Sequence, residues 1–104
     1  MRTFDHFGIP VTTAVEGELY NADLHLFYTD VAASPNKIEF LRFESDCPFH
    51  ELIKTTPHIA YSVPSVEEAI VGANVIYPPF SPVEGMTVAF IEEEGIPIEL
   101  NHID

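Results

Sequence analysis

Three features are scarce in this chain, and each shortage excludes a class of protein. Cys47 is the only cysteine among 104 residues, so an internal disulfide and every multi-cysteine metal motif are excluded. Four basic residues face 17 acidic ones, and the resulting charge of −13 opposes binding to nucleic acids and anionic membranes. No run approaches the ~20 apolar residues of a membrane helix, and the N-terminus lacks a signal-like apolar stretch. We therefore expect a cytoplasmic protein without nucleic-acid or membrane partners.

The length and the residue pattern predict one small domain rich in strands, covering residues 1–104. A chain of this size with 46% hydrophobic residues can bury one core. Nine prolines and five glycines divide it into pieces of strand length. The segment 12–23 has no helical period and is interpreted as a loop that runs into a strand. The strand candidates are residues 3–11, 24–31, 37–44, 58–63, 74–77, 86–92 and 96–103.

Residues 65–72 have the clearest helical pattern. Ser65 is a suitable N-cap, and Glu68 completes a capping box three residues later. Gly72 suits the left-handed conformation in which many helices end. A helix of about two turns is expected here.

A second helix is predicted over residues 46–54. Asp46 or Ser45 can cap it, and Pro48 is tolerated because it falls in the first turn. This helix would link two halves of similar size, module one at about 1–46 and module two at about 56–104.

The two halves repeat a short pattern, which predicts two copies of one module. The stretch 5–11 (DHFGIPV) matches 57–63 (PHIAYSV), because in both a histidine precedes an apolar, a small and another apolar residue, with valine two further on. Later in each half a glutamate interrupts a short apolar strand, as Glu39 in IEF and Glu99 in IEL.

Strand alternation puts each of these histidines on a face with small residues. His6 shares its face with Gly8, and His58 shares its face with Ala60, which leaves room beside each imidazole for a ligand. The opposite face, which carries Phe7 in the first copy, is apolar and is predicted to be the core.

Glu39 and Glu99 lie in strands that are apolar on either side, where a carboxylate is costly to desolvate without a cation. Alone, each His or Glu would be an ordinary structural or surface residue. Their recurrence at corresponding places predicts one shared site, with a divalent metal ion as the partner because basic side chains are scarce.

Two imidazoles and two carboxylates from His6, Glu39, His58 and Glu99 suit Ni²⁺, Co²⁺, Mn²⁺, Fe²⁺ or Zn²⁺, with two positions left for water or substrate. Such an ion can act as a Lewis acid while a neighbouring carboxylate moves a proton at carbon. Glu99 and Glu39 are the candidate catalytic bases.

The pattern resembles the vicinal oxygen chelate superfamily, which includes glyoxalase I, methylmalonyl-CoA epimerase, extradiol dioxygenases and the bleomycin-resistance proteins. The resemblance covers nearly the whole chain and is strongest in 57–63 with the helix 65–72, and in 79–91 leading to 97–100. It implies an α+β fold in which paired βαβββ modules form a half-open, barrel-like sheet around a metal.

In this family the ligands lie on the first and last strand of each module, which corresponds here to His6, Glu39, His58 and Glu99. The chain departs from the family pattern in module one, where the helix is reduced or missing. It is therefore similar to a compact branch of glyoxalase-like proteins.

The predicted function is that of a metal-dependent lyase or isomerase of glyoxalase type. A small dicarbonyl, hydroxy-acid or hydroxy-carbonyl substrate is favoured, because sites for anionic coenzyme A adducts usually recruit several basic side chains. The alternative is a non-enzymatic small-molecule binding protein of the bleomycin-resistance type, and a third possibility is a structural dimer with a vestigial cleft. Exposed sheet edges in so short a chain, and the resembled family, favour a homodimer.

Overall fold

The structure is a computed structural model that describes residues 1–104, and its main element is one eight-stranded sheet. Three short helical elements accompany it, η1 (Val31–Ala33), α1 (Glu51–Thr55) and α2 (Val66–Ala69). None of them has the length and apolar character needed to cross a membrane. The strands are β1 (Thr3–Pro10), β2 (Leu19–Asn21), β3 (Leu26–Tyr28), β4 (Ile38–Phe43), β5 (His58–Ser62), β6 (Asn74–Phe80), β7 (Met86–Glu93) and β8 (Ile96–Ile103).

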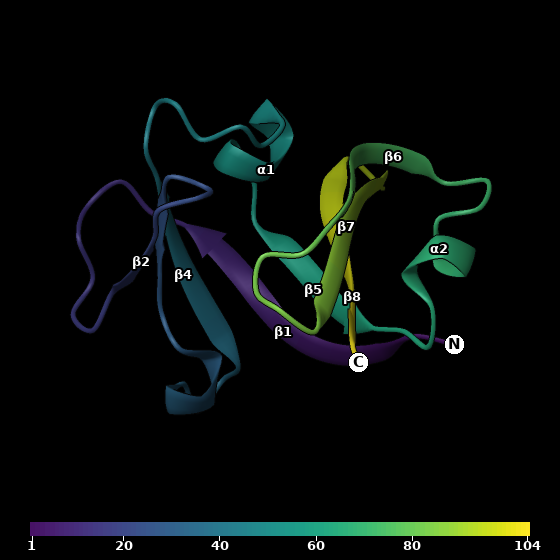
Figure 1. The fold of residues 1–104 in the computed structure, drawn as a ribbon. Helices are drawn as coiled ribbons and strands as arrows, with labels where there is room; N and C mark the ends of the chain where they lie inside the picture. Colours follow the sequence, from purple (N-terminus) through teal and green to yellow (C-terminus); the bar gives the residue numbers. More distant parts are fainter.

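The strand order β2-β3-β4-β1-β5-β8-β7-β6 gives the sheet two related halves. The central strands β1 and β5 are antiparallel, and each pairs in parallel with the last strand of its own half, β4 or β8. Figure 1 shows β1 and β5 joining the half that contains β2 and β4 to the half that contains β6, β7 and β8. The curled sheet confirms the expected α+β fold of paired modules.

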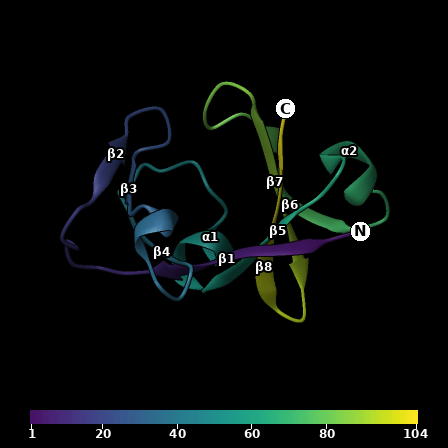
Figure 2. The ribbon, with the colours of Figure 1, turned by 90° about the horizontal axis from the view of Figure 1, so that it is seen from below.

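The first half lacks the helix that the second half has between its first two strands. The chain runs from β1 to β2 through a loop, whereas α2 connects β5 to β6. Both views place α2 on the far side of β6 and β7, away from β2 and β3 (Figures 1 and 2). The missing helix in module one was expected from the sequence and is confirmed.

Most strands fall where the alternating pattern places them, and the deviations have local causes. β6 continues to Phe80 through Pro78 and Pro79, beyond the expected end at 77. It is the edge strand of the sheet, so missing N–H donors there break no inner hydrogen bonds. β3 is shorter than expected, because His25 has φ 55° and a turn of 3₁₀ helix capped by Asp30 begins at Val31.

The N-cap of α2 is Ser65, as predicted, but the helix ends at Ala69 and is shorter than the two turns expected over residues 65–72. Ser65 Oγ accepts a hydrogen bond from the backbone N–H of Glu68 at 3.2 Å, and Gly72 has φ 76°. The predicted helix over residues 46–54 is wrong at its start, because α1 begins at Glu51.

The late start of α1 follows from two local features. Pro48 disfavours the helical conformation at the residue before it. His50 then caps the helix in place of Asp46, with its Nδ1 accepting the N–H of Leu52 at 3.0 Å.

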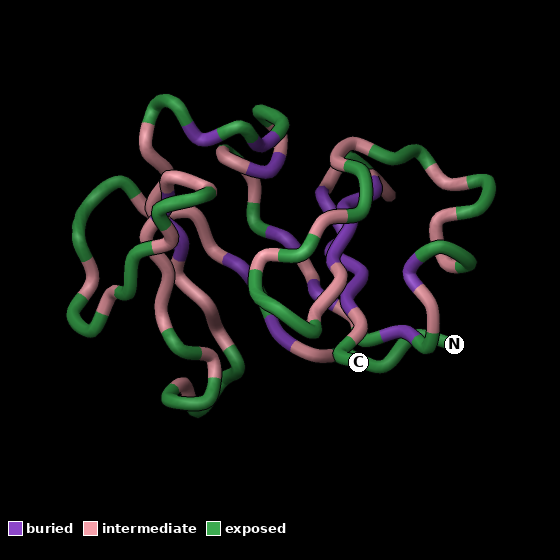
Figure 3. Tube along the Cα trace, viewed as in Figure 1, coloured by how far each residue is buried: buried purple, intermediate pink, exposed green.

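Two apolar clusters pack on opposite faces of the sheet, because β7 contributes Val88 and Phe90 to the inner cluster and the alternating Ala89 and Ile91 to the outer one. Figure 3 shows buried backbone, in purple, along β7 and β8. The outer face of the second half is covered by α2, which contributes the fully buried Val66. The outer face of the first half has no such cover, and Phe4 and Phe7 are each 40% exposed there. The prediction that the face carrying Phe7 is core is therefore wrong, because the helix that would bury it is absent. The inner cluster consists of Leu26, Leu41, Cys47, Phe49, Ile53, Val88 and Phe90.

Candidate metal centre

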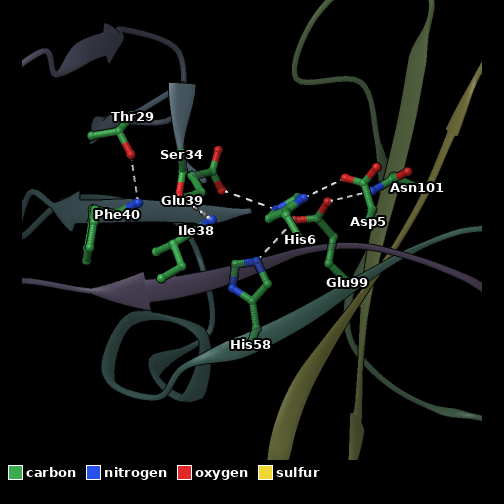
Figure 4. A network of polar contacts seen from close by, with 10 residues as sticks. All are labelled: Asp5, His6, Thr29, Ser34, Ile38, Glu39, Phe40, His58, Glu99 and Asn101. Atoms are coloured by element: carbon green, nitrogen blue, oxygen red, sulfur yellow. Dashed lines mark hydrogen bonds and ion pairs between the residues drawn. The ribbon is translucent and has the colours of Figure 1, made fainter. Parts of the chain in front are cut away.

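The four side chains singled out from the sequence meet on the inner face of the sheet (Figure 4). His6 comes from β1, Glu39 from β4, His58 from β5 and Glu99 from β8. One potential ligand atom from each lies within 4.8 Å of the others. His6 Nε2 is 3.5 Å from Glu39 Oε1 and 3.9 Å from Glu99 Oε1, and His58 Nε2 is 3.3 Å from Glu99 Oε1.

Strand register within each half brings the glutamate to the histidine. In the first half Gly8 pairs with Glu39, and in the second half Ala60 pairs with Glu99. The histidine lies two residues before that small residue on the same strand, and so on the same face. The same local pairing in both halves accounts for the recurrence seen in the sequence.

Register between the halves brings the two histidines together. His6 pairs with Ala60 and Gly8 pairs with His58 across the antiparallel central strands. The rings lie 5.8 Å apart between centroids. The four candidate ligands therefore come from a nearly symmetric arrangement about the contact between β1 and β5.

Gly8 makes room for the His58 ring. A Cβ at this position would lie 2.0 Å from Cε1 and 2.4 Å from both ring nitrogens of His58. Phe90 contacts the same ring edge-on, with centroids 5.4 Å apart. The imidazole is thus held between the bare backbone of β1 and the Phe90 ring. The space at Gly8, which was expected from the sequence to receive a ligand beside His6, is filled by the His58 ring.

His6 is oriented by its neighbour Asp5, whose Oδ2 lies 2.6 Å from His6 Nδ1. Adjacent strand residues normally point to opposite faces, but the register of β1 against β5 shifts between Phe4 and His6. This bulge lets the Asp5 carboxylate reach the ring. A carboxylate that is hydrogen-bonded to Nδ1 leaves Nε2 directed at the middle of the four-residue cluster, as in many histidine ligands of metals.

Glu99 is oriented by Asn101, the next residue on the same face of β8. Asn101 Nδ2 donates to Glu99 Oε2 at 2.9 Å, and both side chains are buried. The other oxygen, Oε1, faces His58 and His6. Glu39 is less enclosed, with 19% of its side chain exposed.

The charges in the site are strongly coupled. Burial opposes protonation of His6, but its contacts with Glu39, Glu99 and Asp5 raise its pKa to about 9. Burial alone would raise the pKa of Glu99, yet its contacts with His58, His6 and Asn101 hold that pKa below the ordinary value. The site is therefore built to favour positive charge between two carboxylates.

The arrangement fits a divalent cation. The Nε2 atoms of His6 and His58 and the Nδ1 atom of His58 are buried without a hydrogen-bond partner, which is costly unless another group binds them. Both Nε2 atoms belong to the cluster, whose two carboxylates would balance the charge of a divalent ion. Imidazole nitrogen and carboxylate oxygen are the donors that first-row divalent ions accept.

A second group, His25, Glu44 and Asp46, also has close ligand atoms, but it lies at the surface. Glu44 there accepts a hydrogen bond from Tyr20 at 2.5 Å. No buried unpartnered nitrogen or oxygen belongs to this group, so it is a poorer metal site.

The repeat between the two halves does not reveal Asp5, Asn101 and Phe90. Pro57 occupies the place of Asp5 in the second half, and Leu41 occupies the place of Asn101 in the first. The only local signal was an acidic residue next to a candidate ligand histidine.

The four side chains form the polar floor of a cavity of about 190 Å³. Twelve of its 18 lining residues are hydrophobic, and they come from both halves of the sheet and from α1. The site is thus a group of charged and polar ligands at the base of an apolar pocket, the usual construction of a small-molecule site.

Two solved structures share this fold. A hypothetical protein from Bacillus halodurans C-125 has a TM-score of 0.68 and 23% identity, with 99% of this chain and 95% of that chain covered. Methylmalonyl-CoA epimerase from Mycobacterium tuberculosis has a TM-score of 0.65 and 18% identity, with 97% of this chain and 87% of that chain covered. At these identities the likeness shows the fold alone. No family model and no curated protein matches the chain.

Proposed function

We propose that this chain is a metal-dependent isomerase or lyase of the vicinal oxygen chelate superfamily, in a compact glyoxalase-like branch. The observation that carries the proposal is the meeting of His6, Glu39, His58 and Glu99, with unpartnered imidazole nitrogens, at the floor of an apolar pocket. The fold shared with methylmalonyl-CoA epimerase supports it.

His6 and His58 would hold the ion through Nε2, and Glu39 and Glu99 would hold it through one oxygen each. A bound divalent ion acts as a Lewis acid towards the oxygens of a carbonyl or hydroxy-carbonyl compound and acidifies the adjacent C–H bond. Asp5 keeps a proton on His6 Nδ1, so Nε2 presents its lone pair to the centre.

The proton at carbon would be moved by the two carboxylates. Glu39 and Glu99 both approach His6 Nε2 at the floor of the pocket, so both are within reach of a substrate bound there. Glu99 is held through Oε2 by Asn101, whereas no side chain holds Glu39 by a hydrogen bond of this kind. Glu39 therefore has more freedom to remove or return a proton, with Glu99 as the second base.

Metal content tests the first half of the proposal. Protein purified without a chelator should contain about one equivalent of a divalent first-row ion, and added Ni²⁺ or Zn²⁺ should raise the Tm of metal-depleted protein. His58→Ala should remove most of this rise, whereas His102→Ala, a histidine outside the cluster, should retain it. The proposal fails if no stoichiometric ion is found and His58→Ala responds to added metal like the parent.

Proton transfer tests the second half. The metal-loaded chain should exchange the C–H hydrogens beside the carbonyl of hydroxyacetone or 2-hydroxyacetophenone with D₂O, followed by NMR. Glu39→Gln should slow exchange by roughly 100-fold or more, the usual contribution of a positioned base. Binding of these ketones without any exchange would instead support a sequestering protein of the bleomycin-resistance type, which the apolar pocket also suits.

A further inference from the structure

We infer that the substrate carries an apolar group the size of a phenyl ring next to its metal-binding oxygens, and that it has no anionic substituent beyond them. This inference deepens the proposed function and rests on it, because the oxygens need the metal. Three observations support it: the walls of the pocket, the positions of the cations and the volume.

Part of the pocket lining is an aromatic cluster to which both halves and the linker contribute. Phe49, which lies in the linker between the halves, has its ring centroid within 4.9–6.1 Å of four other aromatic rings. Three of these partners also line the pocket, and they are Phe43, Phe80 and Phe90. The rest of the apolar lining is mainly aliphatic and includes Leu24, Leu26 and Leu41. Such surfaces favour an apolar ring, which can stack or meet the rings edge-on.

The pocket offers no lysine or arginine to an anionic group beyond the metal-binding head. None of the four basic residues lines it, since the polar lining apart from the four floor residues is limited to Asn21 and the Tyr28 hydroxyl. Asn21 Oδ1 already accepts the backbone N–H groups of Asp23 and Leu24 at 3.0 Å. A carboxylate or phosphate in this pocket would lose its hydration and meet no basic side chain, with only the neutral donors of Asn21 and Tyr28 in the lining.

The basic side chains are used elsewhere in the fold. Arg2 pairs with Glu93, and Arg42 pairs with Glu18. Lys54 Nζ donates a hydrogen bond to the backbone oxygen of Cys47 at 3.0 Å. Lys37 lies over the Phe4 ring and does not line the pocket. With a net charge of −13 as well, the chain is a poor receptor for a coenzyme A thioester.

The volume sets the size of the apolar group. An engineered cavity of roughly 150 Å³ holds a benzene molecule. The pocket here measures about 190 Å³, which leaves space for one ring and a two-oxygen head at the floor. The structure thus assigns the head to the four polar residues and the ring to the aromatic cluster.

Three hydroxamates with the same two-oxygen head test the inference by calorimetric binding to the Zn²⁺- or Ni²⁺-loaded chain. Benzohydroxamate should bind roughly 10- to 100-fold more tightly than acetohydroxamate, because the ring buries apolar surface against the aromatic cluster. The monohydroxamate of succinic acid should bind more weakly than acetohydroxamate, because its carboxylate has no lysine or arginine to meet.

Phe80→Ala should reduce the preference for benzohydroxamate, since this half-buried side chain lines the pocket. Phe27→Ala is the matched control, because Phe27 stacks under Arg42 outside the pocket lining and should leave the preference unchanged. If the chain binds metal but shows equal affinity for the three hydroxamates, only the inference is overturned. If it binds no metal, the proposed function and the inference are both overturned.

Discussion

The substitution Gly8→Ala tests how the site is assembled. The new methyl group would lie 2.0 Å from His58 Cε1, whereas ordinary contacts of a Cβ are 3.4–4 Å. The ring must therefore retreat by about 1.4 Å, the difference between 2.0 and 3.4 Å. Phe90 lies against the same ring, so retreat also disturbs the aromatic cluster. A metal tolerates ligand displacements of only about 0.2 Å, so His58 would cease to be a ligand.

The expected loss of metal affinity is at least ~100-fold, since changes that only disorient a ligand already cost about 10- to 100-fold. At a metal concentration of about 100 times the parent Kd, binding stabilises the parent by about 2.7 kcal/mol. For a chain of this size that is a Tm rise of roughly 10–20 °C. A 100-fold weaker site would gain only about 0.4 kcal/mol under the same conditions, or roughly 2–3 °C.

The assay is thermal unfolding with and without metal, together with a direct metal titration. Gly8→Ala should also lower the Tm of metal-free protein, because overpacking costs about 1–3 kcal/mol. Val66→Ala is the control, because Val66 is buried on the outer face and its loss should lower stability while leaving metal affinity unchanged. A Gly8→Ala variant with the metal affinity of the parent would refute the role given to His58.

Three further predictions concern the surroundings of the site and the outer face. Because the pKa of His6 is about 9 and a proton must leave its Nε2 before metal binds, metal affinity should rise between pH 6.5 and 9; a flat titration would contradict this. The stability of metal-free protein, kept so by a chelator, should have the opposite pH dependence. Because the pKa of His6 is raised above 6.5 by folding, its contribution to stability is complete below pH 6.5, and the Tm should fall as the pH rises through about 9. Asp5→Ala should weaken metal binding by roughly 10- to 100-fold, whereas Asp104→Ala should not, as metal titrations would reveal. The exposed Phe4–Phe7 pair predicts a homodimer of the 11.6 kDa chain, which light scattering should detect and Phe7→Glu should dissociate; a monomeric parent would disprove it.

The candidate ligands were predictable from the sequence because they depend on strand alternation and on a repeat. Alternation fixed which face carries His6 and which carries Glu39, and the repeat then selected His58 and Glu99 as their counterparts. Both rules are local, and neither needs knowledge of how the halves pack. The meeting of the two halves at β1 and β5 required only that equivalent strands pair.

The parts that the sequence did not reveal depend on non-local or irregular structure. Asp5 reaches His6 through a bulge that alternation does not foresee. The start of α1 depends on which residue caps it. Pro48 disfavours a helix that begins at Asp46, so His50 caps the helix instead. The exposure of Phe7 depends on whether a helix covers its face, which a strand pattern cannot indicate.

The two faces of the sheet are subject to separate requirements, and this explains how module one tolerates the loss of its helix. All four candidate ligands lie on the inner face, where strand register alone positions them. A crossover helix packs on the outer face, as α2 does in the second half, and contributes no side chain to the cluster. Its absence therefore leaves the site intact, and the consequence falls on Phe4 and Phe7, whose apolar surface remains exposed. A shortened module can keep its chemistry provided that something else covers that face, and a second copy of the chain is the partner that we propose.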